Sequence, residues 1–192
     1  MPGTRHTMSA EEIRAAHVAE PTRIDGPMHL AEPDPAWPDL FAREAERIRG
    51  ALGEAALAIE HVGSTSVPGL AAKPIIDILL VLVDPADEAA YVRALEAAGY
   101  VLRIREPDWY EHRMFKGPDT DVNLHVLPAR CVEIERMLAF RDHLRRDAAD
   151  RDRYERTKRE LASRTWEYGQ NYADAKTEIV EDILTRALTE RA

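Results

Sequence analysis

The sequence of 192 residues lacks the features that mark several large protein classes. It has a single cysteine, Cys131, which excludes an internal disulfide framework. It contains no run of about 18 apolar residues, so we expect no membrane-spanning helix and no membrane partner. Its first 23 residues lack the apolar stretch of a signal peptide. Together these absences indicate a cytoplasmic protein.

An excess of positive charge is also missing. The chain has 35 Asp and Glu residues against 26 Lys and Arg residues, which gives a net charge of −9. Proteins that bind nucleic acid normally present a basic face, so the composition argues against a nucleic-acid partner, although it allows a local basic pocket. The length fits one domain with a sizeable core.

The first 26 residues are polar and are expected to form an arm beside a domain that spans residues 27–192. We expect this arm to be peripheral, partly flexible, or packed on a partner subunit. Within the arm, Ser9 and Glu12 have the spacing of a capping box, in which each side chain bonds to the backbone of the other residue. This spacing predicts a short amphipathic helix over residues 9–18. Pro21 and Gly26 punctuate the chain after it.

The rest of the chain mixes strands and helices and then becomes helical. Apolar residues at helical spacing predict helices over residues 37–52, 84–98, 132–146, 148–164 and 171–187. Apolar and alternating segments predict strands over residues 28–32, 57–62, 74–83, 100–105, 110–116 and 121–127. This order indicates an α+β fold, with a mixed β-sheet backed by helices and a helical C-terminal tail.

The most informative segment covers residues 59–83 and reads IEHVGSTSVPGLAAKPIIDILLVLV. An apolar strand runs into a Gly-Ser-Thr-Ser turn, and Lys73 then precedes a second apolar strand that contains one acid, Asp77. Backbone N–H groups and hydroxyls of a glycine-containing turn can hold phosphate oxygens. A carboxylate on the next strand can hold Mg²⁺ together with bound phosphates.

Residues 59–77 resemble the signature of the GrpB family, which is largely uncharacterised and is sometimes fused to dephospho-CoA kinase. The resemblance extends from about Met28 to the C-terminus. Further segments fit the pattern of this family: Trp37-Pro38, Asn123-Leu124-His125-Val126, Phe140-Arg141-Asp142, Tyr154 with Lys158, and Tyr172 with Lys176.

The resemblance implies the nucleotidyltransferase superfamily fold. Members of this superfamily carry a Gly-Ser motif, two acids spaced by one residue on the next strand, and a third acid on a later strand; these acids hold two Mg²⁺ ions that position a nucleoside triphosphate. Gly63-Ser64 matches the first motif and Asp77 matches the first acid. Leu79 stands where the second acid is expected, which puts two-metal chemistry in doubt. A single Mg²⁺ held by Asp77 and nucleotide phosphates is compatible with the sequence, because Mg²⁺ usually keeps several waters.

Further candidates offer a hydroxyl, a backbone N–H group, an aromatic ring or a positive charge to a nucleotide: Gly63, Ser64, Thr65, Ser66, Lys73, Arg113, Lys116, Tyr154, Lys158 and Lys176. The spacing of four residues places Tyr154 with Lys158, and Tyr172 with Lys176, on one helix face each. All of these residue types also have structural roles: hydroxyls cap turns, charges protect edge strands, and Tyr and Lys pack along amphipathic helices.

Catalysis is assigned to Asp77, His125 and Asp121, with Asp77 and Asp121 as Mg²⁺ ligands. His61 is expected to line the same cleft. A structural alternative applies here too, because a buried acid is often paired with a cation and a histidine is often a hydrogen-bonded part of the core.

Three functions are compatible with these residues. The first is a transferase that binds a nucleoside triphosphate with Mg²⁺ and transfers a nucleotidyl group to a small molecule, or activates it. The second is a non-catalytic nucleotide-binding or regulatory module, which Leu79 favours. The third is metal-independent acid/base chemistry on a small molecule by the histidines His61, His112 and His125.

Overall fold

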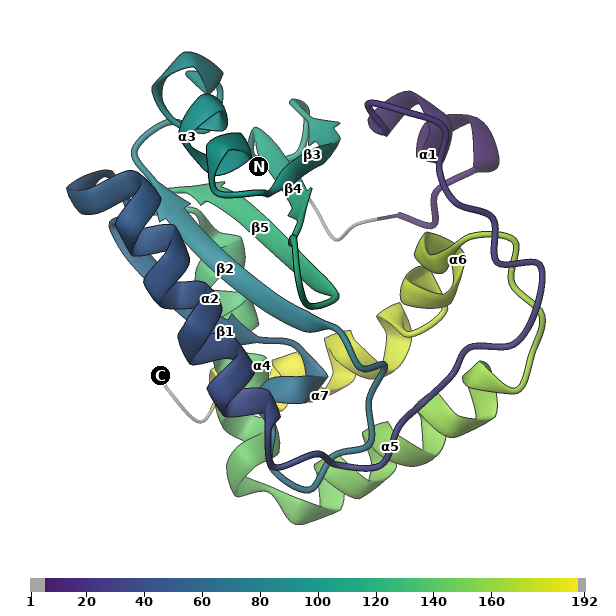
Figure 1. The fold of residues 1–192 in the computed structure, drawn as a ribbon. Helices are drawn as coiled ribbons and strands as arrows, with labels where there is room; N and C mark the ends of the chain where they lie inside the picture. The colour runs from purple at the N-terminus through teal and green to yellow at the C-terminus, as the bar shows by residue number, and fades with distance from the viewer. Residues whose placement is uncertain (1–5, 190–192) are drawn as a thin grey trace.

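The centre of the protein is a five-stranded β-sheet in the order β1-β2-β5-β4-β3 (Figure 1). The computed structural model describes residues 6–189. The strands are β1 (Ala58–Val62), β2 (Ile76–Leu82), β3 (Val101–Glu106), β4 (His112–Lys116) and β5 (Val122–Pro128). The β2–β5 pair is parallel and the other three pairs are antiparallel, which confirms the predicted mixed α+β sheet.

One face of the sheet is closed by α2 (Trp37–Leu52) and α3 (Val92–Ala97). The predicted bounds of α2 are confirmed, and its buried Ile48 packs in the main core. Alternate residues of β2, among them Ile78 and Leu80, face this core together with Leu124 of β5. Since side chains alternate along a strand, the residues between them face the other side of the sheet.

The second face of the sheet packs on α4 (Val132–Arg146) over only part of its area. Leu79 and Val81 of β2 lie here, in a cluster with Leu127 and with side chains of α4. Asp77 precedes Leu79 on the same side of β2, beyond the end of this cluster. The apolar run of β2 is therefore buried on both faces, as its sequence predicts, except at Asp77.

The C-terminal tail is helical, as predicted, and consists of α4, α5 (Ala148–Ala162), α6 (Gly169–Asp174) and α7 (Thr177–Thr189). The helix predicted over residues 171–187 is thus two helices, separated at Lys176. In Figure 1, α5 and α6 extend away from the sheet. Side chains of these helices and of the strands line a common cavity. The side chains that line this cavity form the site described below.

Two other predicted elements differ from the structure. Residues 28–32 form no strand: Ala31 makes an isolated bridge with Ala72, while the N–H group of Met28 bonds to the carbonyl oxygen of Ala162. These two partners belong to different segments, so no continuous ladder forms. The helix predicted over residues 84–98 is reduced to α3 and a short 3₁₀ turn at Glu88–Ala90.

The described part of the arm, residues 6–26, runs across the domain (Figure 1). It begins with α1 (Ala10–Ala16), and the capping box between Ser9 and Glu12 is confirmed. Ile13 of this helix is almost fully buried. The following residues pass α6 and α5 before the chain reaches α2 (Figure 1). No helix within residues 6–189 is long and apolar enough to cross a membrane.

A buried hydrogen bond joins α2 to the strand side of this core. The hydroxyl of Tyr100 donates to Oε2 of Glu44 over 2.6 Å, and the Glu44 side chain is fully buried. We expect Tyr100→Phe to lower the free energy of unfolding by about 1–3 kcal/mol, because a buried carboxylate loses its donor. Urea denaturation measures this loss.

Tyr91→Phe is the matched control, since the hydroxyl of Tyr91 donates over 2.8 Å to a neutral acceptor, the carbonyl oxygen of Pro85. Hydrogen bonds to charged groups are about twice as strong as neutral ones. Tyr91→Phe is therefore expected to lower the free energy of unfolding by less than Tyr100→Phe does. Equal losses of stability in the two variants would contradict this account.

Candidate functional site

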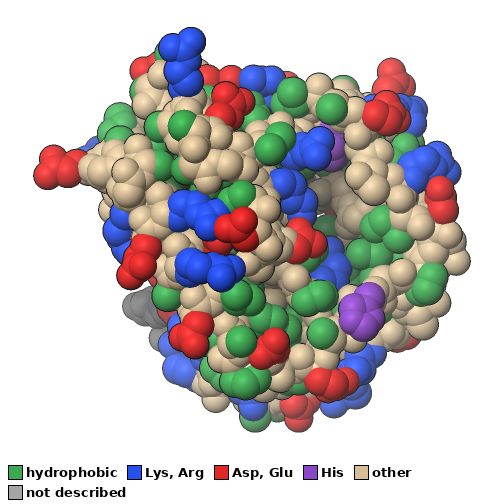
Figure 2. Space-filling view, viewed as in Figure 1, with side chains coloured by type: hydrophobic (Ala, Val, Ile, Leu, Met, Phe, Trp, Pro, Cys, Tyr) green, Lys and Arg blue, Asp and Glu red, His purple; other side chains and the backbone are tan. Residues whose placement is uncertain are grey.

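The space between the sheet and the C-terminal helices is a cavity of about 760 Å³. Its walls come from all five strands, from α4, α5 and α6, and from the arm. Figure 2 shows it as a hollow with Lys and Arg side chains at its rim. Its size lies within the range of roughly 300–1,000 Å³ that is typical of small-molecule sites.

The side chain of Asp77 lies in the cavity, and the turn at Gly63, after β1, determines its position. Val62 pairs with Asp77 across β1 and β2, and Gly63 follows with a positive φ of 67°. A Cβ atom on Gly63 would lie 2.3 Å from Oδ2 of Asp77, so no other residue fits beside this carboxylate. The glycine of the Gly-Ser motif is therefore needed both for its backbone conformation and for the close approach of Asp77.

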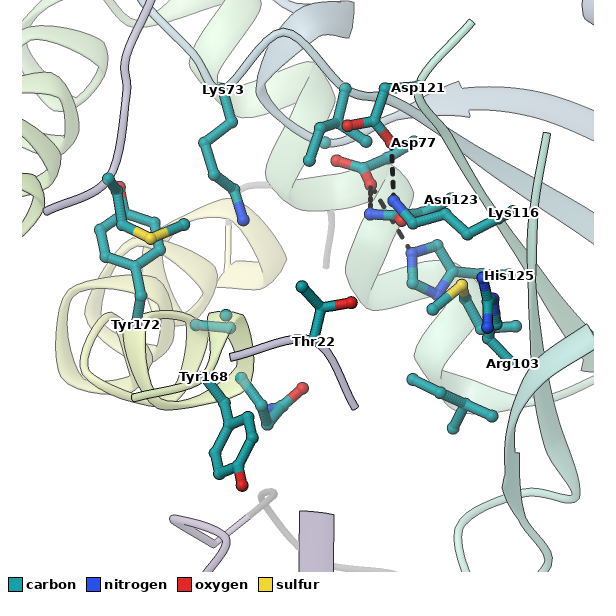
Figure 3. A pocket seen from close by; sticks show the side chains of 18 of the residues that line it. Thr22, Lys73, Asp77, Arg103, Lys116, Asp121, Asn123, His125, Tyr168 and Tyr172 are labelled. Carbon is teal, nitrogen blue, oxygen red and sulfur yellow. Dashed lines mark hydrogen bonds and ion pairs between the residues drawn. The ribbon is translucent and has the colours of Figure 1, made fainter. Parts of the chain in front are cut away.

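The carboxylate of Asp77 is held by two side chains of β5. Nδ2 of Asn123 donates to Oδ1 of Asp77 over 2.9 Å, and Nε2 of His125 lies 3.7 Å from the same oxygen (Figure 3). Burial raises the pKa of Asp77, but His125, Asn123 and the charge of Lys73 together outweigh burial and lower it. Asp77 is thus ionised at neutral pH.

The hydroxyls of the turn are used mainly inside the protein. Oγ1 of Thr65 donates to the carbonyl oxygen of Ile75 over 3.1 Å and lies 3.0 Å from Nε2 of His61. Oγ of Ser66 donates to the carbonyl oxygen of Gly63 over 2.6 Å, and Ser66 does not line the cavity. Gly63, Ser64 and Thr65 do line it. The hydroxyls of Thr65 and Ser66 therefore stabilise the turn, as the structural alternative expects.

Lysine is rare in this chain, and its distribution is uneven. Among the 26 Lys and Arg residues only four are lysines, and all four line the cavity: Lys73, Lys116, Lys158 and Lys176. Arginines supply the remaining positive charges. The ammonium groups thus gather at the cavity even though the whole chain is acidic.

Three of these lysines form what we call the lysine cluster: Lys73, Lys158 and Lys176. Nζ of Lys73 and Nζ of Lys176 lie 5.3 and 4.6 Å from the ring centre of Tyr172. Nζ of Lys158 lies 4.9 Å from the ring centre of Tyr154 and donates to the carbonyl oxygen of Ala71. The predicted pairing on one helix face is confirmed for Tyr154 and Lys158 of α5. Lys176 also lies beside Tyr172, but from the turn after α6 and not from the same helix.

Burial lowers the pKa of every member of the lysine cluster. The pKa falls to about 8 for Lys73, about 7 for Lys158 and about 8 for Lys176. The charge of Lys176 lowers the pKa of the other two further, and Asp77 opposes the shift in Lys73 and Lys176. Burial and mutual repulsion thus disfavour the charged forms of these lysines, and an anionic ligand would offset both.

Lys116 and Asp121 also line the cavity, but they bind each other, with Nζ 2.7 Å from Oδ1. Arg113 lies outside the cavity, because alternation along β4 turns it to the opposite face of the sheet. There its guanidinium contacts Glu88 over 2.7 Å and Glu111 over 3.4 Å. Tyr154 is buried behind the cavity wall. Of the predicted ligands, Arg113, Tyr154 and Ser66 are therefore not brought to the cavity.

The three histidines have different positions. His125 lines the cavity, whereas His61 lies on the other face of the sheet and stacks on Phe41 with ring centres 4.8 Å apart. Burial lowers the pKa of His61 to about 4, so this ring is neutral. His112 lies behind His125 in the sheet, with the two rings stacked 5.3 Å apart. The prediction that His61 lines the cleft is wrong.

The side chains do not fit a two-ion magnesium site. Leu79 is fully buried against α4 and offers no ligand, and Asp121 is engaged by Lys116. Asp77 remains, but its Oδ1 accepts from Asn123 and its surroundings are positively charged. Mg²⁺ requires several oxygen ligands.

The sequence did not reveal that the arm contributes to the cavity. Val18 and Ile24 are fixed at the two sides of the cavity by backbone bonds, to Arg103 over 2.9 Å and to Glu167 over 2.8 Å. Glu20 and Thr22, between them, line the cavity, and Figure 3 shows Thr22 there. The arm is polar and irregular here, so no periodic pattern marks it. Its role arises from contacts that only the folded chain provides.

Comparisons with known proteins agree with this fold. The family model described as GrpB protein matches residues 27–186. A UPF0157 protein of Halalkalibacterium halodurans is 60% identical over 177 residues, which cover 92% of this chain and 91% of that protein. A UPF0157 protein of Streptomyces coelicolor is 46% identical over 158 residues, covering 82% and 83% of the two chains.

A solved structure is similar as well. The crystal structure of a conserved GrpB protein from Enterococcus faecalis superposes with a TM-score of 0.72 at 31% sequence identity. The match covers 85% of this chain and 99% of that chain. The arrangement of sheet and helices is therefore shared with this protein.

The contact between Gly63 and Asp77 generates a test of the site. We expect Gly63→Ala to lower the free energy of unfolding by about 2 kcal/mol or more, because alanine is strained at this φ and its Cβ meets the carboxylate. Gly50→Ala is the control, since Gly50 lies in α2 with open space around it. The control should be neutral or stabilising by up to about 1 kcal/mol. Two equally stable variants would refute the close approach.

Proposed function

The chain belongs to the GrpB family, and for this member we propose that the cavity binds a phosphate-bearing small molecule, specifically a nucleoside triphosphate. The proposed reaction transfers the nucleotidyl group to a second small molecule, or activates that molecule. The observation that carries the proposal is the convergence of all four lysines of the chain on one cavity that also contains Asp77.

The lysine cluster supports the phosphate-binding half of this proposal. Buried ammonium groups repel one another, and an anion with several charges relieves that repulsion. A triphosphate carries several negative charges within one small group, and lysine binds phosphate as a flexible point charge. Tyr172, whose ring lies close to Lys73 and Lys176, fixes their stems beside the space that the phosphates would occupy.

The other end of the cavity has the opposite character. The ionised Asp77 repels phosphate and attracts groups that donate hydrogen bonds, and His125 lies next to it. Figure 3 shows Lys73 on one side of the space and Asp77 with His125 on the other. This polarity supports a hydroxyl or an amine as the acceptor group. No step is assigned to a metal ion, because the residues present do not form the two-ion site.

A non-catalytic nucleotide-binding module is the alternative, and it would use the same lysine cluster. The burial of Leu79, where a second acid would complete a metal site, favours this alternative. The two functions differ in turnover, so pyrophosphate release with alcohols and amines as acceptors distinguishes them.

Calorimetric titration with ATP, GTP, CTP and UTP, each with and without Mg²⁺, tests the proposal. We expect at least one nucleotide to bind, and Lys176→Met to weaken that binding by about tenfold or more, because a charged hydrogen bond to phosphate is lost. Arg93→Met is the matched control, since it removes one exposed positive charge outside the cavity.

Three outcomes have distinct meanings. Equal weakening in the control would show that only the net charge matters. Absence of binding to all four nucleotides would refute the proposal. Binding that is strictly dependent on Mg²⁺ and abolished by Asp77→Asn would restore the metal-dependent mechanism expected from the family resemblance.

The lowered pKa values of the lysine cluster predict the direction of proton exchange. Near pH 8, Lys73, Lys158 and Lys176 are partly neutral in the free protein. Bound phosphates favour the charged lysines and raise their pKa values, so nucleotide binding should take up protons. Affinity should fall as the pH rises above 8, because binding then has to protonate neutral amines.

Calorimetry in two buffers with different ionisation enthalpies measures this uptake. Lys176→Met should reduce the number of protons taken up, whereas Arg93→Met should leave it unchanged. Proton release, or an affinity that increases above pH 8, would contradict the placement of phosphate at the lysine cluster.

A further inference from the structure

We propose that Arg103 is a second anion site of the cavity and binds a carboxylate group of the acceptor molecule. The acceptor is then a small hydroxy acid or amino acid, with its hydroxyl or amine at Asp77 and its carboxylate at Arg103. The role of this molecule as an acceptor rests on the proposed function, but the binding of a carboxylate to Arg103 does not.

A register shift in β3 determines where the side chain of Arg103 points. Leu102 pairs with Phe115, and Ile104 pairs with Met114. Two steps along β3 thus match one step along β4, and Arg103 is the extra residue. A β-bulge of this kind breaks the alternation of side chains and redirects one of them. As a result, the consecutive residues Arg103 and Ile104 both line the cavity.

The residues on either side of the bulge show the same break. Leu102 packs in the main core, on the face that α2 and α3 cover. Arg105 contacts Glu88 over 2.7 Å, and Arg113 binds the same acid on this face. In a regular strand, residues three apart face opposite sides of the sheet. Because the bulge lies between Leu102 and Arg105, both face α2 and α3, and Arg103 is turned towards the cavity.

The backbone of Arg103 is held in place, whereas its guanidinium is available. The carbonyl oxygen of Arg103 accepts from the N–H group of Val18 in the arm over 2.9 Å. Within residues 6–189, the guanidinium makes no hydrogen bond and no ion pair, not even with Glu20, the acid of the arm that lines the same cavity. All five of its N–H donors are therefore open to a ligand.

Arg103 lies across the cavity from the lysine cluster, at the end that contains His125. Figure 3 shows Arg103 and His125 on one side of the space and Lys73 on the other. Strand pairing accounts for this position, because Met114 of β4 pairs with His125 on one side and with Ile104 on the other. Arg103 immediately precedes Ile104 in β3. A triphosphate at the lysine cluster thus leaves Arg103 to a different anionic group.

The separation between Arg103 and Asp77 suits a small molecule. Asp77 lies on β2 and Arg103 on β3, with β5 and β4 between them. Neighbouring strands are about 4.8 Å apart, so the two backbones are roughly 14 Å apart. Both side chains reach into the cavity, which shortens the gap between their charged groups. A molecule with a donor group at one end and an anionic group at the other fits this gap.

The local charges favour a carboxylate over a phosphate at Arg103. One guanidinium offsets one negative charge, and its planar fork matches the two oxygens of a carboxylate. A phosphate monoester carries a charge of about −1.5 to −2 near neutral pH. Such a group would leave excess negative charge at the end of the cavity where Asp77 is ionised.

Matched probes measure what the carboxylate contributes. Glycine, β-alanine and γ-aminobutyrate, together with the corresponding hydroxy acids, are each compared with the carboxamide of the same length. We expect at least one acid to bind the nucleotide-free protein in a chemical-shift titration and to shift the Nε–H resonance of Arg103. Its carboxamide should bind about tenfold more weakly, because the charged hydrogen bond is lost.

Variants then locate the carboxylate. Arg103→Met should weaken binding of the acid by about tenfold and leave the carboxamide unchanged, whereas Arg103→Lys, which keeps the charge without the fork, should have an intermediate effect. Arg93→Met, an exposed position outside the cavity, is the control and should have no effect. Since the side chain of Arg103 makes no bond within the described chain, we expect both variants to keep the thermal stability of the wild type.

Several outcomes would overturn the role of Arg103. These are absence of binding by every acid, equal binding of acid and carboxamide, or weakening of the acid by Lys176→Met but not by Arg103→Met. A larger shift of the Arg103 resonance with inorganic phosphate than with any acid would also overturn it. If no nucleotide binds, the proposed function fails, but the titration with carboxylates still decides whether Arg103 is an anion site.

Discussion

The close approach of Asp77 to Gly63 is the constraint on which the rest of the site depends. The pairing of Val62 with Asp77 brings the carboxylate against the turn, and only a residue without a Cβ atom leaves room for it. From this position Asp77 meets Asn123 and His125 on the parallel neighbour β5. The same register places Leu79 against α4. The pairing of β1 with β2 thus brings Asp77 into the site and buries the position where a second acid would be expected.

The sequence predicts helices and strands best where residues such as proline or glycine indicate their ends. The helix over residues 37–52 is correct at both ends, because Pro38 fits a first turn and Gly53 stops the helix. The alternation in β5 correctly assigns Asn123 and His125 to the polar face. The strand predicted over residues 28–32 is wrong, because an apolar segment does not indicate which segments its backbone will bond to. The long-range fold sets these partners.

The composition of the site was only partly predictable. Lys73, Lys158 and Lys176 were recognised one by one, but they meet only because α5 and the turn between α6 and α7 pack beside the loop before β2. Their separation along the chain hides this. The same reason explains why Arg113 and Lys116, three residues apart on β4, point to opposite faces. The rarity of lysine was the sequence signal for this cluster, because a chain that uses arginine almost everywhere has only four lysines.

The arm crosses the cavity between backbone bonds near Val18 and Ile24, and it lies before the region that the family model matches. It donates no strand to the sheet and no residue to the contact between Gly63 and Asp77. The arm is bonded to β3 and to the segment between α5 and α6, and not to the turn that holds Asp77. A change in the length or side chains of this segment can reshape what the cavity admits while the sheet stays intact. Specificity in such a protein can diverge at low cost to folding.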